Sequence, residues 1–146
     1  MSTTKSTCSI QPYLFFNGRC DEALEFYRKA LNAEATAVIR YKDSPVPVKD
    51  QNPDKVMHAN FRVGETQIMA SDGMSSEGGQ FQGFALTLNV PTEADADRFF
   101  SALAEGGQVQ MPLAKTFYSP RFGMVTDRFG ILWMILTAAD KTGAKQ

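Results

Sequence analysis

The chain has 146 residues, of which 43% are hydrophobic and 21% charged, the composition expected of one globular domain with a buried core. Its 15 basic and 16 acidic residues leave a formal net charge of −1. This balance argues against nucleic acid as the main partner, because phosphate binding needs clustered Lys and Arg. No apolar run approaches the roughly 20 residues that span a bilayer, and residues 1–9 are polar. We therefore expect no membrane partner and a cytoplasmic location.

Two cysteines, Cys8 and Cys20, are too few for a disulfide framework or a structural zinc site. Cys20 lies near the start of a predicted helix, where the helix dipole can lower the pKa of a thiol. The alternative is that Cys20 is a partly buried bystander. We expect neither cysteine to carry the function.

The first half of the chain reads as a strand, a helix and three further strands. An extended apolar run predicts a strand at residues 10–16, ended by a turn at Asn17-Gly18. A helix follows at residues 20–31, and Asn32 ends it. Its apolar side chains recur at helical spacing, at Ala23, Phe26, Tyr27, Ala30 and Leu31. The remaining elements are a strand at 35–41, a Pro-rich loop at 42–55, and a hairpin of strands 57–63 and 66–71 that turns at Gly64-Glu65.

The second half repeats this order. A strand at residues 84–90 precedes a helix that begins at the capping residue Thr92 and ends at Gly106-Gly107. This helix carries the same apolar spacing, at Ala96, Phe99, Phe100, Leu103 and Ala104. Strands are predicted at 109–113, 124–126 and 131–137, with Asp127 and Gly130 in the turn between the last two. The repetition indicates a duplicated α+β module.

The predicted boundaries follow from this repetition. The first module covers about residues 10–71, a Ser- and Gly-rich hinge covers 72–83, and the second module covers about 84–137. Short polar tails flank the two modules. We expect the two to form a single domain.

Three local strings make the pattern more specific. They are Met57-His58-Ala59, the segment 68–74 (Ile-Met-Ala-Ser-Asp-Gly-Met), and the segment 122–135, which contains Asp127-Arg128-Phe129-Gly130. With them the chain resembles the PhnB-like branch of the vicinal-oxygen-chelate (glyoxalase/bleomycin resistance/dioxygenase) superfamily. The resemblance implies an α+β fold in which two βαβββ modules form a cupped eight-stranded sheet with helices outside. It also implies a homodimer, in which modules of two chains close each cleft.

Members of this branch also carry the label of a demethylubiquinone methyltransferase. We discount methyl transfer, because no glycine-rich loop follows a strand in the arrangement that commonly cradles S-adenosylmethionine.

The resemblance further implies where metal ligands would lie in the superfamily's metal enzymes. These positions fall on Tyr13, Met69, Phe84 or Ala85, and Met134. Zinc, nickel, iron and manganese need His, Asp, Glu or Cys as ligands. The chain has a single histidine, His58. We therefore expect no such metal and no cofactor.

One face of the predicted hairpin is the candidate pocket lining. With a two-residue turn, alternation directs Phe61 and Ile68 toward the helices. The opposite face then carries His58, Asn60, Arg62, Gln67, Met69 and Ser71. The resemblance places that face in the cavity, and the alternative is a face turned to solvent.

The predicted ligand-binding residues are Tyr13, Phe15, His58, Asn60, Arg62, Gln67, Met69, Trp133 and Met134. His58 is the catalytic candidate, with a structural histidine as the alternative. Arg62 is either a clamp for an anionic ligand or a solvated arginine at a strand end. Phe15 and Trp133 are either pocket lining or core. Phe117 and Tyr118 could add to the aromatic lining.

These residues favour a binding protein whose metal-free cavity sequesters an unknown small molecule, aromatic or antibiotic-like. The alternative is an enzyme. It would be a lyase, dioxygenase or thiol transferase of the superfamily type, or it would have a metal-free activity that uses His58.

Overall fold

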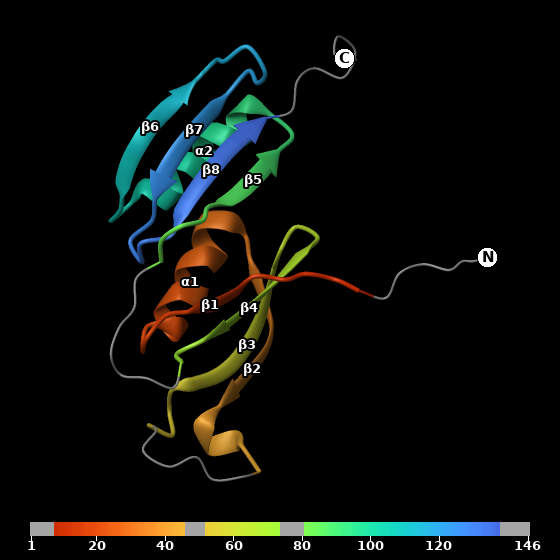
Figure 1. The fold of residues 1–146 in the computed structure, drawn as a ribbon, viewed down its shortest axis with the longest axis vertical. Helices are drawn as coiled ribbons and strands as arrows, with labels where there is room; N and C mark the ends of the chain where they lie inside the picture. Colours follow the sequence, from red (N-terminus) through yellow and green to blue (C-terminus); the bar gives the residue numbers. More distant parts are fainter. Residues whose placement is uncertain (1–7, 46–51, 74–80, 138–146) are drawn as a thin grey trace, which may run out of the picture. The chain divides into compact units, whose positions relative to one another are not determined.

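A computed structural model describes residues 8–45, 52–73 and 81–137 (Figure 1). The chain divides into two compact units, Met1–Glu77 and Gly78–Gln146, and each is described by itself. The first contains β1 (Tyr13–Phe15), α1 (Cys20–Leu31), β2 (Glu34–Arg40), a 3₁₀ helix (Tyr41–Asp43), β3 (Val56–Val63) and β4 (Thr66–Ser71). The second contains β5 (Leu86–Val90), α2 (Glu93–Ala104), β6 (Gln108–Ala114), β7 (Phe122–Thr126) and β8 (Leu132–Thr137).

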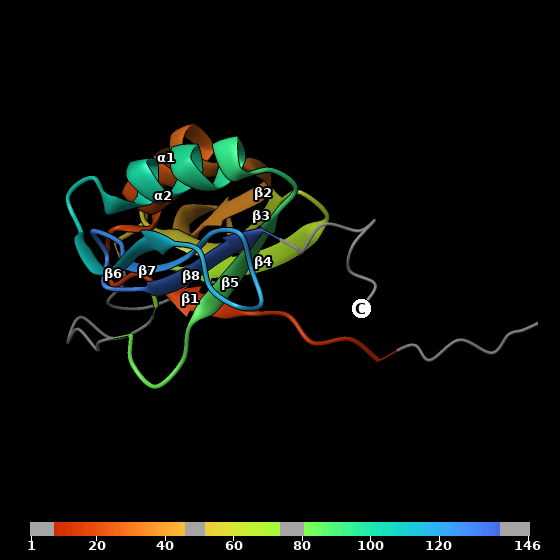
Figure 2. The ribbon, with the colours of Figure 1, turned by 90° about the horizontal axis from the view of Figure 1, so that it is seen from above.

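The two units have the same sheet topology. The strand orders are β1-β4-β3-β2 and β5-β8-β7-β6. In each sheet the first strand pairs with the last in parallel, and the other neighbours are antiparallel. In Figure 2 each helix lies along one face of the sheet of its own unit. The predicted α+β fold of two βαβββ modules is therefore confirmed.

Helix α1 has the predicted bounds and the predicted buried stripe. All five stripe residues are buried, and the Tyr27 ring stacks on Phe61 of β3 at a centroid distance of 5.8 Å. Asn32 ends the helix in the left-handed conformation, with φ of 58°, which asparagine tolerates better than most residues. The stripe thus fixes which face of the first sheet the helix covers.

Helix α2 follows the prediction less closely. The Thr92 hydroxyl caps it by accepting a hydrogen bond from the Asp95 N–H at 3.0 Å. Phe100 is buried, but Phe99 is only half-buried, and the Arg98 guanidinium lies 4.3 Å from the centroid of its ring. A Cβ added to Gly123 of β7 would lie 2.8 Å from the Phe100 ring. The helix therefore packs closely on β7, and glycine makes room for it.

Several strand ends differ from the prediction. The strand predicted at residues 10–16 is ordered as a strand only at Tyr13–Phe15, where it pairs with β4. Pro12 precedes it and has no N–H to donate, although its carbonyl accepts a bond from the Met69 N–H at 2.9 Å. The strand predicted at 84–90 begins at Leu86. The hydrophobic pattern predicted the positions of these strands. Their ends depend on which residues form backbone hydrogen bonds with a neighbouring strand.

Each unit contains a buried aspartate that binds backbone N–H groups. Asp72 accepts bonds from the N–H groups of Cys20 and Val56, both at 2.8 Å. Helix α1 has no side-chain cap from Arg19, so Asp72 supplies one from 52 residues away. The predicted hinge thus begins at a residue that is bonded into the first unit.

Asp127 plays the corresponding part in the second unit. Its Oδ1 accepts bonds from the N–H groups of Phe129 and Ile131, at 2.9 and 3.1 Å. Its Oδ2 accepts the indole N–H of Trp133 at 2.9 Å. The role predicted for Asp127 in shaping this turn is confirmed.

Within the described ranges, no helix combines the length and the apolar character that crossing a membrane requires.

Candidate ligand-binding site

The β3–β4 hairpin has the predicted register. Phe61 pairs with Ile68 on the buried face, while Asn60 pairs with Met69 and Arg62 with Gln67 on the other. Because side chains alternate along a strand, five of the six predicted hairpin residues, from His58 to Met69, share the accessible sheet face that points away from α1. The sixth, Ser71, is buried, and its hydroxyl accepts a hydrogen bond from the Gly73 N–H at 2.8 Å. Tyr13 of β1 pairs with Met69 and joins the accessible face. We call this set of residues the open face of the first unit.

Tyr13 lies at the centre of an aromatic cluster on this open face. Its hydroxyl is 2.8 Å from Nδ1 of His58. Its ring stacks on Phe15 at a centroid distance of 4.9 Å and an interplanar angle of 10°. Tyr13 is 38% exposed and Phe15 50% exposed. The structure therefore brings three of the predicted residues together as an accessible aromatic surface, and Phe15 is not a core residue.

Tyr13 enters its hydrogen bond with His58 as a neutral phenol. Burial raises the pKa of the Tyr13 hydroxyl, helped by the Tyr41 and Cys20 side chains. A neutral phenol can donate to Nδ1 or accept from it, so the tautomer of His58 decides the direction of the bond. In either case Nε2 is the ring nitrogen that Tyr13 does not use.

The polar neighbours on the open face differ in their availability. Asn60 and Gln67 are half-buried, as is the apolar Met69 beside them. Arg62 is exposed at the strand end and forms an ion pair with Glu34 of β2. An anionic ligand would have to compete with that carboxylate, so the structure favours the reading of Arg62 as a strand-end arginine.

Two predicted site residues belong to the second unit. Trp133 is 3% exposed, and its indole N–H is bonded to Asp127, which places it in the core of that unit. We therefore leave Trp133 out of the site proposed below. Met134 lies on the opposite face of β8 by alternation. Its place in one cavity with Tyr13 stays a prediction.

The pairing of β1 with β4 and of β5 with β8 changes one of the four residues that the resemblance implied at metal-ligand positions. Tyr13 is opposite Met69 in β1–β4, and Thr87 is opposite Met134 in β5–β8. The prediction of Phe84 or Ala85 was wrong: the 73-residue spacing of the aromatic pairs leads from Tyr13 to Leu86, and the segment from β5 to α2, one residue shorter than its counterpart, moves the position to Thr87. The four side chains are then a phenol, two thioethers and a hydroxyl, which do not suit zinc, nickel, iron or manganese. Among the described residues, no three His, Cys, Asp or Glu side chains gather as a metal-binding group.

Cys20 is a core residue. Its side chain is fully buried, and this burial raises the pKa of the thiol to about 12. The nearby Asp72 and Asp21 carboxylates act in the same direction. The possibility that the helix dipole lowers this pKa is therefore wrong.

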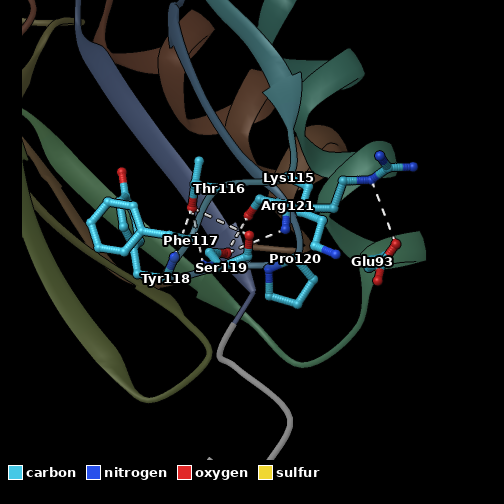
Figure 3. Close-up of a pocket in the computed structure, with 8 residues that line it drawn as sticks. All are labelled: Glu93, Lys115, Thr116, Phe117, Tyr118, Ser119, Pro120 and Arg121. Atoms are coloured by element: carbon cyan, nitrogen blue, oxygen red, sulfur yellow. Dashed lines mark hydrogen bonds and ion pairs between the residues drawn. The ribbon is translucent and has the colours of Figure 1, made fainter.

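A separate hollow of about 470 Å³ lies in the second unit (Figure 3). It is lined by Glu93, Lys115, Thr116, Phe117, Tyr118, Ser119, Pro120 and Arg121. Arg121 was not predicted here, and its guanidinium is 3.2 Å from Asp97 and 3.8 Å from Glu93. Phe117 and Tyr118 thus line a surface on the β6–β7 connection, where acidic partners already engage the arginine.

Comparison with known proteins agrees with this fold. The family model described as 3-demethylubiquinone-9 3-methyltransferase matches residues 8–136. Protein YjdN of Escherichia coli (strain K12) is 36% identical over 136 residues, covering 86% of this chain and 92% of YjdN. The crystal structure of protein PA1353 from Pseudomonas aeruginosa is 44% identical, with a TM-score of 0.81, and covers 92% of this chain and 100% of that chain. The PhnB protein from Bacillus cereus is 29% identical, with a TM-score of 0.74 and coverages of 90% and 100%.

A more distant likeness concerns the fold alone. A glyoxalase-related enzyme from Fulvimarina pelagi is 16% identical, with a TM-score of 0.57, and covers 88% of this chain and 87% of that chain. The chain therefore belongs to the family described as 3-demethylubiquinone-9 3-methyltransferase, resembles a PhnB protein, and shares its fold with a glyoxalase-related enzyme.

Proposed function

We propose that this protein binds a small planar aromatic molecule, such as an aromatic metabolite or antibiotic, on the open face of its first unit. The observation that carries the proposal is the stacked pair of Tyr13 and Phe15 beside His58. A contiguous exposed aromatic patch points to a binding surface more than a single exposed ring does, and aromatic contacts contribute about 0.5–1.5 kcal/mol beyond buried area.

The polar groups around the aromatic pair suit recognition of a ligand's edge. Nε2 of His58, the ring nitrogen that is not bonded to Tyr13, can donate or accept according to the tautomer, and the half-buried amides of Asn60 and Gln67 can donate or accept. A mainly apolar surface with a few fixed polar groups is the usual composition of a small-molecule site. The binding that we propose needs no divalent metal, because it uses rings and hydrogen bonds only.

A metal-free enzyme is the second candidate, favoured by the Tyr13–His58 hydrogen bond. Tyr13 would orient the imidazole, and His58 would exchange a proton with a substrate through Nε2. This role is that of an acid or base, and it does not resemble methyl transfer. The described residues contain no glycine-rich loop between a strand and a helix that could cradle S-adenosylmethionine.

The ligand proposal is tested by a thermal-shift screen of small metabolites and aromatic antibiotics. Compounds that bind should raise the Tm of the wild-type protein by mass action. Phe15→Leu should weaken their binding about tenfold, because the stacking surface loses one ring. Phe117→Leu is the matched control, since Phe117 is 99% exposed but lies in the second unit. Treatment with a chelator should leave the wild-type shifts unchanged.

Three outcomes of this screen would count against the proposal. One is that no compound raises the Tm. Another is that Phe117→Leu abolishes the shifts while Phe15→Leu preserves them, which would assign the ligand to the hollow of Figure 3. The third is that the chelator removes the shifts, which would make binding depend on a metal.

We also propose that the protein is a homodimer that works in the cytoplasm. The outer strand β6 supports the dimer, because Val109 and Met111 are exposed on it and uncovered edge strands invite pairing. Light scattering at micromolar concentration should give twice the chain mass of 16.1 kDa. A mass equal to one chain would contradict the dimer and leave the ligand site untouched.

A further inference from the structure

The register of the first sheet places Met69 between two of the polar groups of the open face. Tyr13 of β1 and Asn60 of β3 both pair with Met69 of β4, and the pairing of β4 with each of these strands runs without an irregularity. Paired residues on neighbouring strands lie about 4.8 Å apart and point to the same face. The half-buried Met69 therefore has a phenol on one side and a primary amide on the other.

Two primary amides border this apolar floor. Gln67 lies two residues from Met69 along β4 and is diagonal to Asn60, because its direct partner is Arg62. Within the ranges that the structure describes, neither the Asn60 amide nor the Gln67 amide has a hydrogen-bond partner, and both are half-buried. A primary amide presents an N–H donor and a C=O acceptor side by side. The open face thus holds two unused donor–acceptor pairs beside an aromatic surface.

The charges on the open face do not suit an ionic ligand. Its arginine, Arg62, forms an ion pair with Glu34 of β2. The other side chains offered to a ligand are aromatic rings, a thioether and the two amides, none of which carries a permanent charge. A charged ligand would lose hydration there without gaining an oppositely charged partner, and that loss costs free energy. The face therefore favours a neutral ligand.

We infer that the ligand of the open face is a neutral heteroaromatic molecule whose ring edge carries an N–H beside a C=O, as in a lactam. Its ring lies on Met69, next to the stacked rings of Tyr13 and Phe15. The amide of Asn60 forms two hydrogen bonds with the lactam edge, the bidentate pairing that a primary amide also makes with a base edge. This inference rests on the aromatic site proposed above and adds the chemical class of its ligand.

Two matched compounds test this class on the full chain. Isoquinolinone is a bicyclic lactam, and its N-methyl derivative keeps the rings and the carbonyl but has no N–H. NMR titration of the wild-type protein should give a Kd at least about tenfold lower for isoquinolinone, because the N-methyl compound leaves the amide oxygen of Asn60 unpaired. Naphthoate, an anion of similar size, should bind more weakly than isoquinolinone.

Variants separate recognition of the lactam edge from stacking. Asn60→Leu keeps a branched side chain without its polar atoms and should bring the Kd values of the two compounds within about twofold of each other. Gln108→Leu, the matched control, removes an exposed amide from the second unit and should keep the tenfold preference. Phe15→Leu should weaken both compounds alike and leave their ratio unchanged, because it alters the stacking surface only.

The outcomes distinguish the ligand class from the site itself. Equal Kd values for the two compounds in the wild type, both raised by Phe15→Leu, would overturn the lactam class and leave the aromatic site in place. Tighter binding of naphthoate than of isoquinolinone, or a preference that survives in Asn60→Leu, would overturn it as well. So would the failure of all three compounds to bind while other aromatic compounds raise the Tm. A protein that binds no aromatic compound at all would refute the proposed function together with this inference.

Discussion

Replacing Asp127 with alanine should lower the free energy of unfolding by about 3–5 kcal/mol. The carboxylate is buried and accepts three hydrogen bonds, from the N–H groups of Phe129 and Ile131 and from the indole of Trp133. Without it two buried donors and the partly buried N–H of Phe129 lose their acceptor, and each buried donor costs about 1–3 kcal/mol when unsatisfied. The loss is measured by urea unfolding.

The same experiment has an internal probe, because Trp133 is the single tryptophan of the chain. Its fluorescence should change in the folded Asp127→Ala protein, since the indole N–H loses its partner. Glu105→Ala, an exposed acidic residue of the same unit, should change stability by no more than about 0.5 kcal/mol. An Asp127→Ala protein as stable as Glu105→Ala would show that the turn does not depend on this carboxylate.

Asp72→Ala should be the second large loss, at about 2–4 kcal/mol. Its carboxylate joins the first N–H of α1, at Cys20, to the first N–H of β3, at Val56. Removing it leaves two buried donors unsatisfied and the helix without its cap. The free energy of unfolding should be followed by circular dichroism, because the first unit contains no tryptophan.

A matched control for this variant lies in the same unit. Glu65→Ala removes an exposed carboxylate from the hairpin turn and should be nearly neutral. If Asp72→Ala unfolds at the same urea concentration as Glu65→Ala, the cap that Asp72 supplies across 52 residues does not contribute to the free energy of unfolding. That result would leave α1 held by its apolar stripe alone.

The periodic features of the fold could be predicted from the sequence. The stripe of α1 and the register of the β3–β4 hairpin follow from spacing and from the turn at Gly64, which has φ of 60°. The open-face residues from His58 to Met69 follow in turn, because a fixed register determines which side chains share a face.

Contacts between distant segments could not be predicted in this way. Asp72 reads as the first residue of a polar linker, and only the folded unit brings it to the start of α1. The sequence favours core over pocket for Trp133 but does not show its partner, the Asp127 carboxylate that accepts its indole N–H. The pairing of Thr87 with Met134 depends on a one-residue difference between the modules, which repeated aromatic pairs do not reveal.

The central claim is that the open face of the first unit binds an aromatic ligand beside His58. Because His58 is the single histidine, ¹⁵N-histidine NMR observes this site alone. In the free protein the nitrogen shifts report whether Nδ1 or Nε2 carries the hydrogen, and so whether Tyr13 donates to Nδ1 or accepts from it. Titration with a compound that raises the Tm should shift both nitrogen signals and saturate with the binding curve. Nitrogen signals that stay unchanged while the compound still raises the Tm would contradict the proposed site.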